Sequence, residues 1–185
     1  MQVHVSNDAA TSVATGALVV PVFANAAVDG VAAEVDKVLG GEIAGVLANG
    51  EITGKPNETA LIHAAGAPFK RVLVVGLGER EKLTPAALAK YAGTAVRFLG
   101  KRGATSLALA LPAGIDGALG ASFAAEGAIA ATLDTTLYRT EPDKPVVTDD
   151  VTILAGSYDK SAIEAGAKRG AILGEAVNNA RRMAL

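Results

Sequence analysis

Strand-type and helix-type segments alternate along almost the whole chain, and this alternation limits most strongly the folds open to it. Short β-branched apolar runs predict strands at residues 2–5, 17–23, 59–64, 71–75, 106–111 and 151–155. Longer amphipathic or Ala-rich segments predict helices at residues 28–39, 84–99, 117–133 and 158–185, with a short helical turn at 41–48. Alternation of this kind predicts a layered α/β domain with a mixed, mostly parallel sheet and helices on both faces.

Three local signals refine this expectation. The run at residues 71–75 is continuous and branched, as expected for a strand that is covered on both faces. Pro21 lies within the run at 17–23 and suggests a strand end or an edge position, since proline has no N–H for a ladder. Thr84 followed by Pro85 predicts a helix start.

Composition excludes several classes of protein. A length of 185 residues fits one domain, and half of the residues are apolar but only 4% are aromatic, so Ala, Val and Leu must form its core. A net charge of -2 argues against a general nucleic-acid or anionic-membrane surface, and the absence of Cys excludes a disulfide framework or a thiolate nucleophile. No apolar run approaches the ~18 residues of a membrane helix, and the N-terminus does not resemble a signal peptide. We therefore expect a cytoplasmic protein without membrane or nucleic-acid partners.

The most conspicuous motif is a strand that runs into Gly76-Leu77-Gly78. It resembles the start of a dinucleotide-binding fingerprint, which needs a third glycine at position 81. That position is Glu81, and Glu79 adds a second negative charge where phosphates would lie. The favoured interpretation is a tight turn between a strand and a loop.

A second loop after a strand, residues 23–31, contains Asn25 and Asp29. It faintly resembles the first loop of macro domains, which bind ADP-ribose, but it lacks their longer glycine run. Ordinary capping and turn chemistry is the favoured explanation. The alternative is that ADP-ribose or a related nucleotide is held between this loop and Gly76–Gly78, with Asn25, Asp29, Gly76 and Gly78 as the binding residues.

No catalytic or metal-binding residue is predicted in this chain. His4 and His63 are its only histidines, and neither has a carboxylate at ligand spacing, whereas a zinc site needs three or four converging donors. No serine lies in a Gly-x-Ser-x-Gly elbow. Arg181 and Arg182 on the last helix are interpreted as a snorkelling or salt-bridged face rather than a nucleic-acid patch.

Several segments taken in order resemble the N-terminal domain of the cytosolic leucyl aminopeptidase family. They are the segment 54–58 with its following strand, the segment 70–78 followed by Leu83-Thr84, Leu137-Tyr138-Arg139, and the segment 174–182. After Arg139 the family usually continues with an aromatic and basic stretch, whereas residues 140–143 here read Thr-Glu-Pro-Asp.

The resemblance implies a three-layer, macro-like α/β domain at residues 1–156 and an interdomain linker helix at 157–185. It implies a missing C-terminal catalytic domain in which two divalent metals (zinc, manganese or magnesium) activate water, assembly as hexamers, and removal of N-terminal residues such as leucine from peptides. The hallmark Asn-Thr-Asp-Ala-Glu-Gly-Arg of that domain is absent from this sequence. The expected role is therefore non-catalytic, in oligomer assembly and active-site access.

The last expected helix has apolar residues close to a 3.6-residue repeat and no capping residue at its end. These apolar residues are Ile163, Ala167, Ile172, Leu173, Ala176, Val177, Ala180, Met183 and Ala184. We expect the part near residues 163–173 to pack on the sheet of this domain, and the part beyond Val177 to pack on residues that follow position 185.

Overall fold

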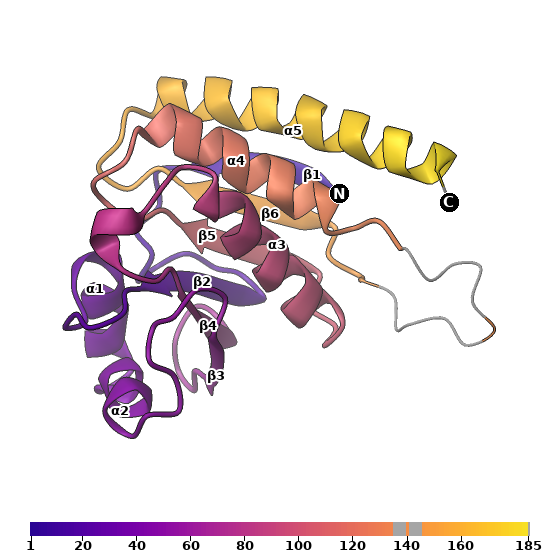
Figure 1. Ribbon diagram of the computed structural model, residues 1–185. Coiled ribbons are helices and arrows are strands. Elements are labelled where there is room, and N and C mark those ends of the chain that lie inside the picture. The colour runs from indigo at the N-terminus through magenta and orange to yellow at the C-terminus, as the bar shows by residue number, and fades with distance from the viewer. Residues whose placement is uncertain (135–139, 141–145, 185) are drawn as a thin grey trace.

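The computed structural model describes residues 1–134, 140 and 146–184. Its core is one six-stranded sheet in the order β1-β6-β5-β2-β4-β3 (Figure 1). The strands are β1 (Gln2–Ser6), β2 (Ala17–Val22), β3 (Thr59–His63), β4 (Arg71–Gly76), β5 (Ser106–Ala110) and β6 (Asp150–Leu154). Only β3 runs antiparallel to its neighbour β4, so the predicted mixed, mostly parallel sheet is confirmed.

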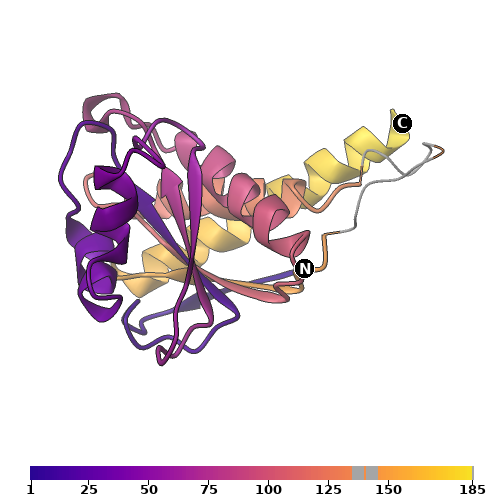
Figure 2. The same ribbon diagram turned by 90° about the horizontal axis from the view of Figure 1, so that it is seen from below.

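Helices cover both faces of the sheet, which gives the three layers seen in Figure 2. The helices are α1 (Gly30–Val38), α2 (Glu42–Ala48), α3 (Ala87–Gly100), α4 (Gly117–Ala130) and α5 (Lys160–Met183), with a 3-10 turn at Arg80–Lys82. α3, α4 and α5 lie on one face, and α1 and α2 lie on the other. None of these helices is both long and apolar enough to cross a bilayer.

The two faces of the sheet have separate cores because side chains alternate along each strand. In β2, Val19 faces α3 and α4, whereas Leu18 and Val20 face α1 and α2. Buried alanines of α4 fill the first core, as the composition predicted. Leu137-Tyr138-Arg139 and residues 141–145 lie outside the described residues.

β2 is a central strand, which corrects the edge alternative suggested by Pro21. It pairs with β4 on one side and with β5 on the other, and all of its residues are buried. Pro21 is nevertheless close to a strand end, because the ladder to β5 covers only Ala17–Val19 with Leu107–Leu109. The missing N–H of Pro21 therefore falls where β2 and β5 have already separated.

α3 begins at Ala87, not at Thr84. The peptide N–H of Ala87 donates to Thr84 O at 3.0 Å, and that of Leu88 donates to Pro85 O at 3.0 Å, so a tighter turn precedes the helix. The N-cap residue of α3 is Ala86, which makes no side-chain capping bond. Proline suits the first turn of an α-helix and also this tighter turn, so Pro85 does not show where the α-helix itself begins. The start expected at Thr84 was therefore three residues early.

α5 packs mainly on α4 and uses small residues for the contact. Its buried residues are Ile163, Gly166, Ala167, Gly170, Gly174 and Asn178. A Cβ at Gly166 would lie 2.0 Å from Ala118 O, and one at Gly170 would lie 1.9 Å from Ser122 O. The expectation that the apolar residues up to Leu173 face the sheet is confirmed for Ile163 and Ala167, which are buried in the same core as the strands. It is wrong for Ile172 and Leu173, which are 61% and 41% exposed.

Candidate functional site

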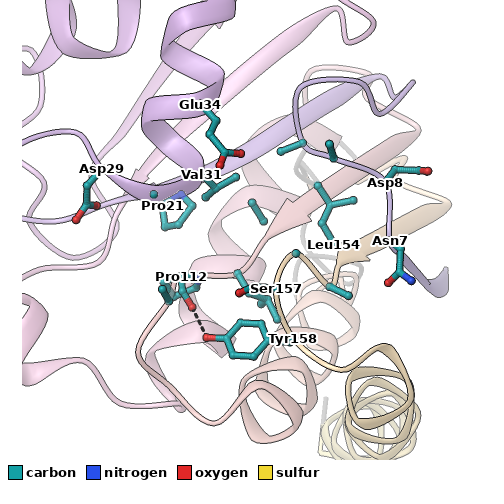
Figure 3. A pocket seen from close by; sticks show the side chains of 18 of the residues that line it. Asn7, Asp8, Pro21, Asp29, Val31, Glu34, Pro112, Leu154, Ser157 and Tyr158 are labelled. Atoms are coloured by element: carbon teal, nitrogen blue, oxygen red, sulfur yellow. Dashed lines mark hydrogen bonds between the residues drawn. The ribbon is translucent and has the colours of Figure 1, made fainter.

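A crevice of about 450 Å³ opens at the carboxyl edge of the sheet (Figure 3). Loops that follow β1, β2, β5 and β6 form its walls. Figure 3 shows Asp29 and Glu34 on one side, Asn7 and Asp8 on the other, and Tyr158 near the base. Four segments far apart in sequence thus meet at one place.

The crevice lies where two neighbouring strands send the chain in opposite directions. After β2 the chain passes to α1 on one face of the sheet, and after β5 it passes to α4 on the other. Ligands of open α/β sheets bind at such switch points, outside the carboxyl ends of the strands. The Tyr91 hydroxyl, at 3.0 Å from Val19 O and 2.9 Å from Ala110 O, links the two strands where their ladder ends.

Charge in the crevice is mostly negative. The Arg80 guanidinium lies 3.9 Å from the centre of the Phe23 ring and pairs with the Asp29 carboxylate. Asp8 and Glu34 add two further carboxylates to the lining. The Asp29 carboxylate pairs with Arg80 and makes no side-chain capping bond to α1. The N–H groups in the first turn of α1 have no acceptor within the helix.

The Tyr158 hydroxyl donates to Pro112 O at 2.8 Å and joins the loops after β5 and β6 (Figure 3). This bond fixes the wall of the crevice next to Ser157. Pro21 and Leu154 supply apolar surface between the charged sides. The crevice can therefore hold a small molecule with one apolar face and polar groups at its edges.

The four residues proposed from sequence are not brought together. Asp29 lines the crevice. Gly76 and Gly78 line a separate hollow of about 410 Å³ beside Lys55 and Lys90. Asn25 is exposed, with φ 54°, and lines neither of the two.

Gly76 and Gly78 allow close backbone contact with the segment at residues 54–56. A Cβ at Gly76 would lie 2.1 Å from Lys55 O, and one at Gly78 would lie 2.9 Å from Pro56 Cγ. The Gly76 N–H donates to Glu58 O at 2.9 Å, and the Gly78 N–H donates to Gly54 O at 2.8 Å. Both N–H groups are thus engaged within the fold, which agrees with a tight structural turn.

The loops after β2 and β4 are also bonded to each other. The Ala24 N–H donates to Gly78 O at 2.9 Å, and the Leu77 N–H donates to Val22 O at 2.9 Å. Sequence reasoning missed the loops after β1 and β6, which carry Asp8 and Ser157 into the crevice. Their only signal was that each follows a strand.

Within residues 1–134, 140 and 146–184, no group of three or more His, Cys, Asp or Glu side chains is arranged to hold a metal ion. His4 Nε2 lies 3.4 Å from Asp150 Oδ1 at the surface, and His63 is exposed at the end of β3. The described residues therefore do not fit the ligand set of a catalytic metal, which needs at least three protein donors.

The chain is similar in sequence to bacterial aminopeptidases. It is 34% identical over 182 residues to a probable cytosol aminopeptidase of Solibacter usitatus, a match that covers 98% of this chain and 35% of the relative. It is 34% identical over 151 residues to one of Acidobacterium capsulatum, covering 80% of this chain and 30% of the relative. The chain thus spans about a third of the length of these curated relatives.

Solved structures resemble the fold. A tomato leucine aminopeptidase mutant superimposes with a TM-score of 0.76 at 18% identity, over 92% of this chain and 35% of that one. The bottromycin maturation enzyme BotP in complex with Mn gives 0.63 at 22% identity, over 89% and 30%. A Trypanosoma brucei macrodomain in complex with ADP gives 0.64 at 15% identity, over 90% and 68%. These likenesses confirm the predicted macro-like α/β fold.

The family model described as the cytosol aminopeptidase family, N-terminal domain, matches residues 19–142. That range runs from β2 past α4. It includes most of β2 and all of β3, β4 and β5, and of these β5, β2 and β4 are neighbours in the sheet. The chain belongs to the cytosol aminopeptidase family, whose N-terminal domain it matches.

Proposed function

We propose that this chain is the non-catalytic N-terminal domain of a larger, metal-dependent leucyl aminopeptidase that removes N-terminal amino acids from peptides. The observation that carries the proposal is the match over 98% of this chain to only 35% of a probable cytosol aminopeptidase. The residues that would activate water then belong to a C-terminal catalytic domain, with two divalent ions such as Zn, Mn or Mg. The Mn in the BotP structure supports a metal in that domain.

The proposal extends to assembly and location. The domain would pack on its own catalytic domain, take part in a hexamer, and restrict access to the active site in the cytoplasm. The names of the relatives, cytosol aminopeptidases, support the location. The exposed apolar residues on α5 support a surface that another part of the assembly covers.

We expect the purified chain to hydrolyse no leucine p-nitroanilide in the presence of Mn²⁺. Metal-assisted hydrolysis needs a bound ion that lowers the pKa of its water, and the described residues contain no ligand cluster for one. Release of p-nitroaniline is measured against a blank with metal alone, with the full-length Solibacter usitatus relative as the positive control. Turnover that co-elutes with the chain on gel filtration would contradict the proposal.

A second candidate function is binding of ADP-ribose or a related nucleotide, and the crevice at the switch point favours it. The macrodomain that shares this fold was solved with ADP. The uncapped first turn of α1 supplies N–H donors at one side of the crevice. The carboxylates of Asp8 and of Glu34, which lies on α1, oppose a phosphate there, so any nucleotide would have to keep its phosphates at the Gly30 end of α1, near Arg80.

Calorimetric titration with ADP-ribose tests this candidate. Ser157→Trp places a large side chain at the crevice wall, and we expect it to weaken binding by about tenfold or more, equivalent to about 1.4 kcal/mol. Asn25→Ala is the matched control, because Asn25 lines neither hollow and its loss should leave the affinity unchanged. Absence of heat at high micromolar ligand would rule the candidate out.

A further inference from the structure

The crevice at the carboxyl edge of the sheet carries negative charge that the chain itself leaves unpaired. Asp8, Asp29 and Glu34 line it, and among the described residues of its lining Arg80 is the one cation. Arg80 is already engaged, by the Asp29 carboxylate and by the Phe23 ring. Neither Asp8 nor Glu34 is in an ion pair with a described residue. Two carboxylates therefore remain without a cation.

These two carboxylates lie on opposite sides of the crevice (Figure 3). Glu34 belongs to α1, and Asp8 belongs to the loop after β1. Lys37 is the one cationic residue of α1, and it does not line the crevice. A hollow with apolar walls and charges of one sign concentrates ions of the opposite sign. The crevice thus attracts cations, and it offers them two separate points of contact.

The surface between the two carboxylates is apolar and already formed. Leu154 is only 3% exposed and lies between Glu34 and Asp8 in Figure 3. Pro21 is buried and also lines the crevice. The bond from the Tyr158 hydroxyl to Pro112 O fixes the adjoining wall. Because these walls need no rearrangement, a ligand that binds here gives up mainly its own conformational freedom.

This arrangement suits neither a metal ion nor a phosphate group. Within residues 1–134, 140 and 146–184, no three His, Cys, Asp or Glu side chains are grouped to hold a metal ion. A phosphate would meet the negative charge of Asp8 and Glu34, whereas Arg80 is already paired. The volume of about 450 Å³ is near the lower end of the range for small-molecule sites. The fitting occupant is a small organic cation with two separate charges and an apolar middle.

We propose that the crevice binds a linear aliphatic diammonium ion. One ammonium group contacts Asp8, the other contacts Glu34, and the methylene chain between them packs on Pro21 and Leu154. Each ammonium group donates its N–H groups to carboxylate oxygens that accept no hydrogen bond from a side chain of the described residues. The proposal does not rest on the function proposed above, because it concerns a site within this chain alone.

The test compares three ligands that share one carbon chain and differ in charge. They are 1,5-diaminopentane with two ammonium groups, pentylamine with one, and 1-pentanol with none. Each is titrated at millimolar concentrations into the 15N-labelled chain, and amide shifts are followed at residues 7–10, 29–34 and 154–158. We expect the diamine to bind about fivefold more tightly than pentylamine, and pentylamine more tightly than pentanol, because an exposed ion pair contributes up to about that factor.

Two variants assign the two ends of the ligand. Asp8→Asn and Glu34→Gln remove one charge each and keep the shape of the side chain. Each should weaken the diamine about fivefold, to the affinity of pentylamine, and leave pentanol unchanged. Glu51→Gln is the matched control, because Glu51 is an exposed carboxylate that lines a different hollow. Amide spectra recorded without ligand check that each variant keeps the fold.

The other outcomes overturn the proposal in distinguishable ways. Equal affinity for the diamine and pentylamine would mean that only one carboxylate takes part. A loss in Glu51→Gln as large as in Asp8→Asn would mean general attraction to an acidic surface, and absence of shifts at the crevice would mean no site. Shifts of the same residues by ADP-ribose at lower concentration than by the diamine would make this a nucleotide site. None of these results bears on peptide hydrolysis, so the proposed function is tested separately.

Discussion

Replacing Gly170 with alanine should destabilise the domain by about 2 kcal/mol or more, although alanine is the better helix former. In a helix interior this exchange normally stabilises by roughly 0.5–1 kcal/mol. Here the added Cβ would lie 1.9 Å from Ser122 O and 2.7 Å from Ser122 C, both of them backbone atoms of α4. Since backbone cannot rotate away, the two helices must separate, and overpacking of this kind costs about 1–3 kcal/mol or more.

The expected loss corresponds to a fall in Tm of about 4–8 °C for a domain of this size, measured by thermal unfolding followed by circular dichroism. Gly45→Ala is the matched control, because Gly45 lies within α2 and an added Cβ there has no neighbour within 4 Å. That variant should gain about 0.5–1 kcal/mol. If both variants stabilise the domain, the close contact between α4 and α5 is wrong.

The same glycines explain why sequence reasoning misplaced the buried face of α5. Hydrophobic periodicity gives no weight to glycine, so Ile172 and Leu173 were expected inside. In the structure Gly166 and Gly170 form the contact, since only residues without a side chain let the two backbones approach this closely. Their four-residue spacing was visible in the sequence, but the spacing alone does not name the partner helix.

The strands and their sheet type were predictable from local patterns, whereas their order was not. The branched run at residues 71–75 became β4, fully buried except at Arg71. No local pattern, however, shows that β6 inserts between β1 and β5, so that the first strand pairs with the last. That pairing depends on which face each helix covers, and hence on contacts between residues more than 100 positions apart.

The candidate site was predictable only in part for a related reason. Asp29 was singled out and does line the crevice. Gly76 was singled out for the same sequence context, a loop after a strand, but its N–H is used by Glu58 O. A glycine that follows a strand serves equally for ligand approach and for backbone contact, and only the position of residues 54–58 decides between them.

Tyr91→Phe should also lower the free energy of unfolding by about 2 kcal/mol at neutral pH, with a fall in Tm of about 4–8 °C. Tyr91 is 1% exposed, and its hydroxyl contacts Val19 O at 3.0 Å and Ala110 O at 2.9 Å. Phenylalanine keeps the ring and the packing but leaves these carbonyls without this donor. Tyr158→Phe is the control, because it removes one hydroxyl bond, to Pro112 O, at a half-buried position and should cost less.

The difference between wild type and Tyr91→Phe should shrink at alkaline pH. Burial raises the pKa of the Tyr91 hydroxyl well above the ordinary value of a tyrosine, because the charged form would lose its hydration. Above pH ~10 the unfolded chain therefore releases this proton while the folded chain keeps it, so wild-type stability falls by up to about 1.4 kcal/mol per pH unit. The phenylalanine variant lacks this proton and does not share the fall.

Urea unfolding of both proteins between pH 8 and pH 11 measures the difference in their free energies of unfolding, and taking this difference cancels the titration of all other groups. A difference that does not change with pH would mean that Tyr91 ionises as freely in the folded domain as in the unfolded chain. The hydroxyl would then be open to water at the point where β2 and β5 separate, next to Ala110 in the crevice wall. A narrowing difference instead requires a dry link between the strands, and such a link is what allows the crevice above it to stay open without loosening the centre of the sheet.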